Sequence, residues 1–143
     1  MKITFPGGAR VNAEHKGFTI KTDQSERSGG DGSAPAPFDY FLASIGTCAG
    51  VYAHNFLTHR NLSTVGLQLT LNTTKDPDTR MISNVELEVK LPEGFPKKYE
   101  RALINAINLC SVKKHILTPP GFSTTLVRAP AEPVGAASKP ERV

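Results

Sequence analysis

Residues 34–57 read APAPFDYFLASIGTCAGVYAHNFL, and this stretch decides how the rest of the chain must fold. After the prolines comes one acidic residue, Asp39, and then a long apolar run with Cys48 in its middle. The apolar residues fall on every side of a 3.6-residue period, which predicts a helix from Phe38 to about Arg60 that other elements cover on all sides. An acidic residue in the first turn suits the positive end of the helix dipole, which by itself accounts for Asp39.

Length and charge point to one ordinary domain. The chain has 143 residues and a formal net charge of +4, and we expect a single domain over 1–128 with a disordered tail over 129–143. The basic residues are scattered and do not interleave with aromatic ones, which argues against nucleic-acid binding. Because no segment has the length of a membrane span or the apolar core of a signal peptide, we expect a cytoplasmic protein with no membrane partner.

Alternating apolar residues on both sides of the predicted helix indicate antiparallel sheet. Short alternating runs separated by turn residues over 2–24 are typical of two or three strands. Every second residue is apolar in 67–71 and again in 85–91, which predicts two half-buried strands joined by a turn at 75–81. The segment between the first strands and the helix, residues 25–37, is rich in Gly, Ser and Pro and is interpreted as a flexible loop.

A second helix is predicted over residues 95–110, with an inward-facing stripe made of Tyr99, Leu103, Ile107 and Cys110. A short third helix or turn follows at 111–121, and residues 122–128 are typical of a last strand. The fold class is therefore α+β, with antiparallel sheets, a central cysteine-bearing helix and a second cysteine helix.

The two cysteines of the chain, Cys48 and Cys110, both fall on inward-facing positions. A reducing compartment disfavours a permanent disulfide, which leaves free, metal-bound or redox-active thiols. The spacing of the cysteines and the four histidines does not match a metal site, so neither a metal nor a cofactor is expected. Two interpretations stay open: a buried redox pair, or two small hydrophobic residues packed in a core.

Two motifs resemble those of a known family. The stretch at 34–50, APAPFDYFLASIGTCAG, resembles the signature helix of the OsmC/Ohr family of osmotically induced and organic hydroperoxide resistance proteins, and LCSVKKHIL at 109–117 resembles its second cysteine motif. The resemblance covers about residues 1–127 and implies an intertwined homodimer with its sites at the subunit interface. It also implies a thiol-dependent peroxidase in which Cys48 is the peroxidatic residue and Cys110 the resolving one. The substrate would be an organic hydroperoxide, with hydrogen peroxide a poorer one, and an external dithiol would be the reductant.

The same resemblance implies an arginine, held by a carboxylate, beside the peroxidatic sulfur. A cation is needed because the thiolate is the nucleophile, whereas an apolar pocket alone raises the pKa of a thiol. Asp39 is the candidate carboxylate, one residue later than the glutamate of the peroxide-resistance branch, and Arg10 and Arg27 are both candidates for the arginine. The shifted acid motivates an alternative function, a dimer of this fold that binds a small apolar, thiol or acyl ligand without efficient peroxidase activity.

Overall fold

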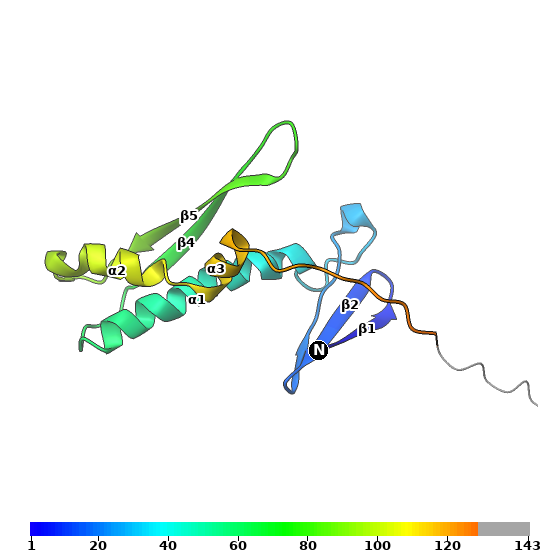
Figure 1. The fold of residues 1–143 in the computed structure, drawn as a ribbon, viewed down its shortest axis with the longest axis horizontal. Coiled ribbons are helices and arrows are strands. Elements are labelled where there is room, and N and C mark those ends of the chain that lie inside the picture. Colours follow the sequence, from blue (N-terminus) through cyan, green and yellow to red (C-terminus); the bar gives the residue numbers. More distant parts are fainter. Residues whose placement is uncertain (129–143) are drawn as a thin grey trace, which may run out of the picture.

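A computed structural model describes residues 1–128, which form an elongated α+β fold (Figure 1). The chain begins with a three-stranded antiparallel sheet of β1 (Lys2–Gly7), β2 (Arg10–His15) and β3 (Phe18–Ile20), in that spatial order. There follow a short 3-10 turn η1 (Glu26–Ser28), helix α1 (Pro37–Thr58), the hairpin of β4 (Gln68–Lys75) and β5 (Ile82–Lys90), the 3-10 turn η2 (Lys97–Tyr99), and helices α2 (Glu100–Ile107) and α3 (Ser111–Leu117). The predicted α+β class, its antiparallel sheets and the first helix are confirmed.

The core lies between α1, α2 and the inner face of the β4–β5 hairpin. The antiparallel register pairs Leu69 with Val89 and Leu71 with Leu87, so the alternating apolar residues of both strands share one face. That face packs against a buried cluster consisting of Ala49, Ala53, Phe56, Leu57, Leu103, Ile107 and Cys110. The small alanines on α1 let the neighbouring elements approach the helix closely, which brings the start of α3 alongside α1.

Contrary to the prediction, α1 is not covered on all sides. Phe38, Phe41 and Val51 are 54%, 41% and 56% exposed. One chain supplies α2, α3 and a two-stranded hairpin, and these cover only part of the circumference of a helix that is apolar all round. The remaining apolar face is left open in the isolated subunit.

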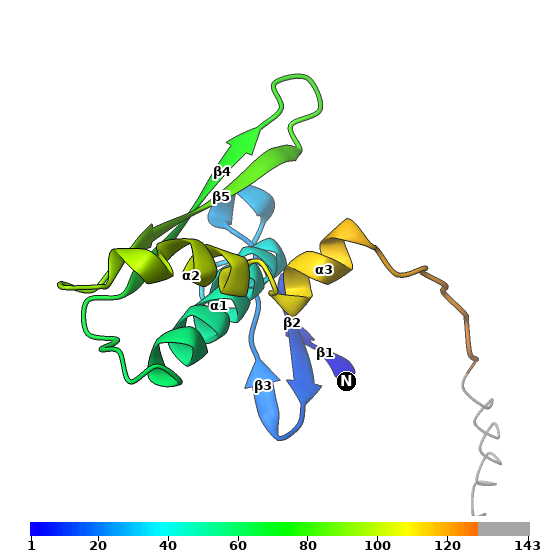
Figure 2. The same ribbon diagram turned by 60° about the vertical axis from the view of Figure 1, so that its left-hand side comes forward.

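The β1–β3 sheet lies at the opposite end of α1 from α2 (Figures 1 and 2). Within residues 1–128 it contributes no residue to the buried core. Ile3, Phe5 and Phe18 are 49%, 79% and 74% exposed. A sheet normally buries one apolar face against another layer, and here that layer does not come from the described part of the same chain.

Two further predictions about the C-terminal half are wrong. Residues 95–110 do not form one helix, because α2 ends at Ile107 and the chain turns so that Cys110 becomes the N-cap of α3. Residues 122–128 are not a strand, and Phe122 and Leu126 are 92% and 96% exposed, since no strand within residues 1–128 lies beside them to pair with. The tail predicted at 129–143 lies outside the described residues. Within 1–128, no helix combines the length and apolar character that crossing a membrane requires.

The loop interpreted as flexible is organised around one buried carboxylate, Asp23, which is 1% exposed. Its oxygens accept hydrogen bonds from the backbone N–H groups of Gln24, Asp31 and Ser33 at 2.8, 3.2 and 3.0 Å, and from the Ser33 hydroxyl at 2.7 Å. These donors, that hydroxyl first, lower the pKa of Asp23 from 3.8 to about 2. Gly30 is required beside it, because a Cβ there would lie 2.1 Å from the Gln24 carbonyl oxygen.

Candidate active site

The structure brings the two cysteines together from different elements. Cys48 lies in the middle of α1 and is partly buried, whereas Cys110 follows α2, caps α3 and is 1% exposed. Both are free thiols, and they lie close enough for each to shift the pKa of the other. Two residues that are 62 positions apart in the sequence therefore form a dithiol pair within one subunit.

Cys110 is the buried member of the pair. Its sulfur accepts a hydrogen bond from the backbone N–H of Lys113 at 3.5 Å and lies 4.0 Å from the carbonyl oxygen of Ile45 on α1. Burial raises the pKa of the Cys110 thiol, and the neighbouring Cys48 raises it further because a second negative charge is unfavourable there. When Cys48 loses its proton, the Cys110 thiol is therefore still protonated.

Cys48 has the opposite electrostatic environment. The backbone N–H of Val112 contributes most to holding the pKa of the Cys48 thiol below its ordinary value. A hydrogen bond with the Cys110 thiol and the backbone N–H of Ser111 act in the same direction, while burial opposes them. Because the thiolate is the reactive form of cysteine, Cys48 is the nucleophile that this arrangement favours.

The other three predicted site residues lie elsewhere in the isolated subunit. The Asp39 carboxylate accepts a hydrogen bond from the backbone N–H of Ala36 at 2.8 Å, which is the helix-capping role that its position suggested. Arg10 donates to the Gly7 carbonyl at 3.2 Å and lies 3.6 Å from Asp31.

Arg27 belongs to η1 and is exposed. Among the side-chain hydrogen bonds and ion pairs of residues 1–128, none joins Asp39, Arg10 or Arg27 to Cys48. The roles of these three residues stay predictions.

One contact beside the thiols was missed by sequence reasoning. The Tyr52 hydroxyl lies 3.1 Å from the Ser111 hydroxyl, which joins α1 to the first residue of α3. In the sequence, Tyr52 belongs to the apolar run of the predicted helix. The available signal was its spacing, because a residue four positions after Cys48 shares the same helical face.

An apolar groove of about 460 Å³ lies on the Cys110 side of the pair, lined by neighbours of Cys110 but by neither cysteine itself. Its lining includes Val85 and Leu87 of β5, Ile104 and Ile107 of α2, and Ile45 and Lys113, which both contact Cys110. Such a groove suits an alkyl group better than a small polar molecule.

The arrangement gives no support to metal chemistry. Residues 1–128 contain no group of three or more His, Cys, Asp or Glu side chains that could hold a metal ion. His115, the histidine nearest to Cys110 in the sequence, is exposed and uses Nδ1 to bond the Ser111 carbonyl at 2.8 Å, within its own helix.

Comparison with known proteins gives a family match and a shared fold. A family model described as OsmC-like protein matches residues 30–125. A solved structure from Psychrobacter arcticus 273-4, described as an osmotic stress induced and detoxification response protein, is 23% identical with a TM-score of 0.67, and the match covers 79% of this chain and 84% of that one.

Two other structures are more distant. A hypothetical protein from Aquifex aeolicus VF5 is 18% identical, with a TM-score of 0.59 and coverage of 82% and 86% of the two chains. An organic hydroperoxide resistance protein OsmC from Legionella pneumophila is 16% identical, with a TM-score of 0.51 and coverage of 80% and 85%. A search of the curated proteins found no match.

Proposed function

This chain belongs to the OsmC-like protein family, and from that premise we propose that it is a thiol-dependent peroxidase that reduces organic hydroperoxides, and hydrogen peroxide less well. The observation that carries the proposal is the contact between two free thiols whose pKa values are shifted in opposite directions, that of Cys48 down and that of Cys110 up. A nucleophilic thiol beside a protonated second thiol is the combination that a peroxidatic and resolving pair needs.

The first step takes place at Cys48. Its thiolate attacks the terminal oxygen of the hydroperoxide, so that an S–O bond forms and the O–O bond breaks. The alkoxide leaves and takes up a proton to become the alcohol, and Cys48 is oxidised to a sulfenic acid. The backbone N–H groups of Val112 and Ser111 stabilise the thiolate before the attack.

The second step uses Cys110. Oxidation of Cys48 removes the negative charge that had helped to raise the pKa of Cys110, so the second thiol ionises more readily after the first step than before it. The Cys110 thiolate attacks the Cys48 sulfur, an S–S bond forms, the S–O bond breaks, and the hydroxide that leaves takes up the proton given up by the Cys110 thiol to become water. An external dithiol then reduces the disulfide by thiol–disulfide exchange, which returns both thiols.

We also propose that the working unit is a homodimer. The proposal is supported by the apolar side chains that one subunit leaves open on α1 and on the β1–β3 sheet, among them Phe5, Phe18 and Val51. In an intertwined dimer, Arg10 or Arg27 of the partner subunit would supply the cation that residues 1–128 of the same chain do not bring to Cys48. Asp39 remains the proposed carboxylate partner of that arginine.

Light scattering tests the dimer. The wild-type protein is expected to have twice the mass of one chain, and Phe5→Asp or Phe18→Asp should reduce it to one, because a buried unpaired charge is costly. Val65→Asp is a matched control, since Val65 is 82% exposed but lies between α1 and β4, far along the chain from the sheet. A monomeric wild-type protein would contradict the proposal.

Stopped-flow kinetics test the activity. Fully reduced protein is mixed with a slight excess of cumene hydroperoxide or hydrogen peroxide, and peroxide consumption is followed. Fast consumption of both, faster for cumene hydroperoxide because of the apolar groove, is the expected result. Rates no higher than those of a free thiol would reject the peroxidase.

A second candidate function is favoured by the groove itself. A dimer that binds a small apolar, thiol or acyl ligand beside Cys110 would use the same 460 Å³ space without peroxide chemistry. This alternative predicts that Cys48 reacts with peroxides like a free thiol, while an apolar ligand binds to the reduced protein and to the Cys48→Ser variant with equal affinity. Fast peroxide reduction by the wild-type protein would reject this second function.

A further inference from the structure

The side-chain contact between Tyr52 and Ser111 has a consequence for the thiol pair. Tyr52 lies one helical turn after Cys48 on α1, and both side chains pack against the same buried cluster. Its hydroxyl meets that of Ser111 at 3.1 Å. Ser111 directly follows Cys110, so this hydrogen bond ties the residue next to the second thiol to α1, the helix that carries Cys48.

Apart from Cys110 at its N-cap and Val112, which packs against the core cluster, helix α3 makes few contacts that hold it in place. None of its seven residues is buried, and the segment 118–128 that follows it is exposed. Within the described residues, the Tyr52–Ser111 hydrogen bond is the one side chain to side chain bond that joins α3 to α1. Lys113 bonds Asn108 at 2.7 Å, just beyond the end of α2, and His115 bonds within α3.

We propose that Tyr52 and Ser111 are the positioning residues of this site, and that their hydrogen bond keeps the backbone N–H groups of Ser111 and Val112 directed at the Cys48 sulfur. Val112 packs against the same cluster as Cys48 and Tyr52, so a shift of α3 away from α1 would carry its N–H group away from the sulfur. The inference deepens the proposed function, since it assigns the activation of Cys48 in part to a contact made within the subunit.

The other ionisable groups around this contact are already engaged. Cys110 is in contact with Cys48, and on α3 the side chains of Lys113 and His115 bond Asn108 and the Ser111 carbonyl. Tyr52 itself bonds through its hydroxyl. Removing that hydroxyl therefore changes the position of α3 without deleting a charge.

The test is the pH dependence of Cys48 alkylation in full-length protein. Iodoacetamide reacts with the thiolate, and peptide mass spectrometry reads Cys48 and Cys110 separately. Tyr52→Phe and Ser111→Ala should each slow Cys48 alkylation at pH 7 by about three- to tenfold, as expected for one net hydrogen bond, and move its midpoint to higher pH. Ser111→Thr keeps the hydroxyl and should restore the wild-type profile.

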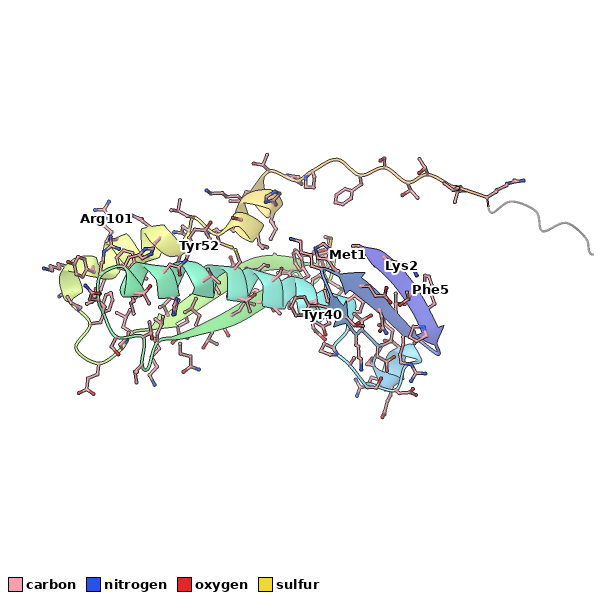
Figure 3. The ribbon with its side chains drawn as sticks, turned by 90° about the horizontal axis from the view of Figure 1, so that it is seen from below. Met1, Lys2, Phe5, Tyr40, Tyr52 and Arg101 are labelled. Atoms are coloured by element: carbon pink, nitrogen blue, oxygen red, sulfur yellow. The ribbon has the colours of Figure 1, made fainter. Side chains whose placement is uncertain are left out.

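Tyr40→Phe is the matched control. Tyr40 lies on the same helix, but its hydroxyl donates to the Lys21 carbonyl at 2.9 Å, at the end where α1 meets the β1–β3 sheet (Figure 3). It should leave the Cys48 midpoint unchanged. Thermal unfolding of each variant, measured in parallel, identifies any that fail to fold. If Tyr52→Phe does not fold, Ser111→Ala alone tests the hydrogen bond.

The possible results separate this inference from the proposed function. If Tyr52→Phe and Ser111→Ala fold and keep the wild-type Cys48 profile, the positioning role is overturned, whatever the peroxide kinetics. If both variants shift the midpoint while Tyr40→Phe does not, the positioning role is supported. Slow peroxide reduction by the wild-type protein would then reject the peroxidase and leave the assignment of Tyr52 and Ser111 standing.

Discussion

The two ends of α1 differ in how much of their surroundings one chain provides. The end that carries the thiols is packed: Leu57, Leu103 and Cys110 are at most 1% exposed, and the Cys110 sulfur accepts a hydrogen bond from the backbone N–H of Lys113. The end beside the β1–β3 sheet leaves Phe5 and Phe18 more than 70% exposed. One chain thus brings the two thiols together, whereas the part of the chain that carries the candidate arginines leaves large apolar side chains exposed.

This contrast assigns two sources to the reactivity of Cys48. The backbone N–H groups near Cys110 come from the same subunit and are already in place. The cation that the family resemblance implies is absent from the site in one subunit, because Arg10 is engaged with Gly7 and Asp31 and Arg27 lies on an exposed turn. The following predictions separate these two contributions.

The largest effect is expected from Cys48→Ser. A serine hydroxyl is a far weaker nucleophile than a thiolate at neutral pH, so peroxide reduction should fall to the background rate. Stopped-flow consumption of cumene hydroperoxide measures it, with Cys110→Ser as the matched control. The control should still react once with peroxide and then stall, with Cys48 open to further oxidation. Full activity in Cys48→Ser would contradict the assignment of the nucleophile.

The packed end predicts a large loss of stability in Leu103→Ala. Truncating this 1% exposed side chain should lower the free energy of unfolding by about 2–5 kcal/mol, since it leaves a cavity in the core. Urea denaturation at a fixed protein concentration measures the loss. Asn105→Ala, at an exposed position of the same helix, should change the value by less than about 0.5 kcal/mol. Equal losses in both variants would show that α2 is not part of the core.

The open end predicts that Arg10→Ala and Arg27→Ala differ in their effects. If one of these arginines reaches Cys48 in the dimer, the variant that lacks it should react with peroxide about ten- to hundredfold more slowly, as expected for a charge-assisted hydrogen bond. The pKa of Cys48 should also rise in that variant. The other variant should behave like the wild-type protein. Wild-type rates in both variants would mean that neither arginine supports the thiolate and that the backbone contacts suffice.

The smallest effect is expected in acid, at the loop that leads from the sheet to α1. The pKa of Asp23 is lowered from 3.8 to about 2, so the unfolded chain binds a proton more readily than the folded one. The stability that this carboxylate contributes is therefore complete above about pH 4 and is lost as pH falls toward 2.

Asp23→Asn tests this dependence by urea denaturation at several pH values. The variant should be less stable at pH 7 and should lose part of the decline in acid. Asp39→Asn is the matched control, because the Asp39 carboxylate is exposed and accepts one backbone hydrogen bond. An unchanged acid profile in Asp23→Asn would show that the loop is not organised by this residue.

Sequence periodicity predicted the parts of this fold that depend on local patterns. The alternation of apolar residues correctly predicted which faces of β4 and β5 are apolar. The stripe predicted for the second helix correctly identified Leu103, Ile107 and Cys110 as buried. It placed Cys110 inside the helix, however, because periodicity does not reveal a turn that keeps the next residue on the same side. Helix α2 ends at Ile107, and the turn that follows allows Cys110 to cap α3.

Contacts between distant residues account for what the sequence did not reveal. Asp23 falls at the end of the segment predicted to form the first strands, and its burial depends on Ser33, ten residues away. The Tyr52–Ser111 contact spans 59 residues. The prediction of a fully covered α1 failed for another reason: the sequence shows that the helix is apolar all round, but not that residues 1–128 leave part of it uncovered.

Mass spectrometry of the oxidised protein tests the central claim most directly. Reduced protein is treated with one equivalent of cumene hydroperoxide, digested without reduction, and mapped. The account predicts a Cys48–Cys110 disulfide within one subunit, formed in a single turnover and fully reversed by a dithiol. Cysteines that remain reduced while the peroxide persists, or a disulfide that links two subunits, would contradict it.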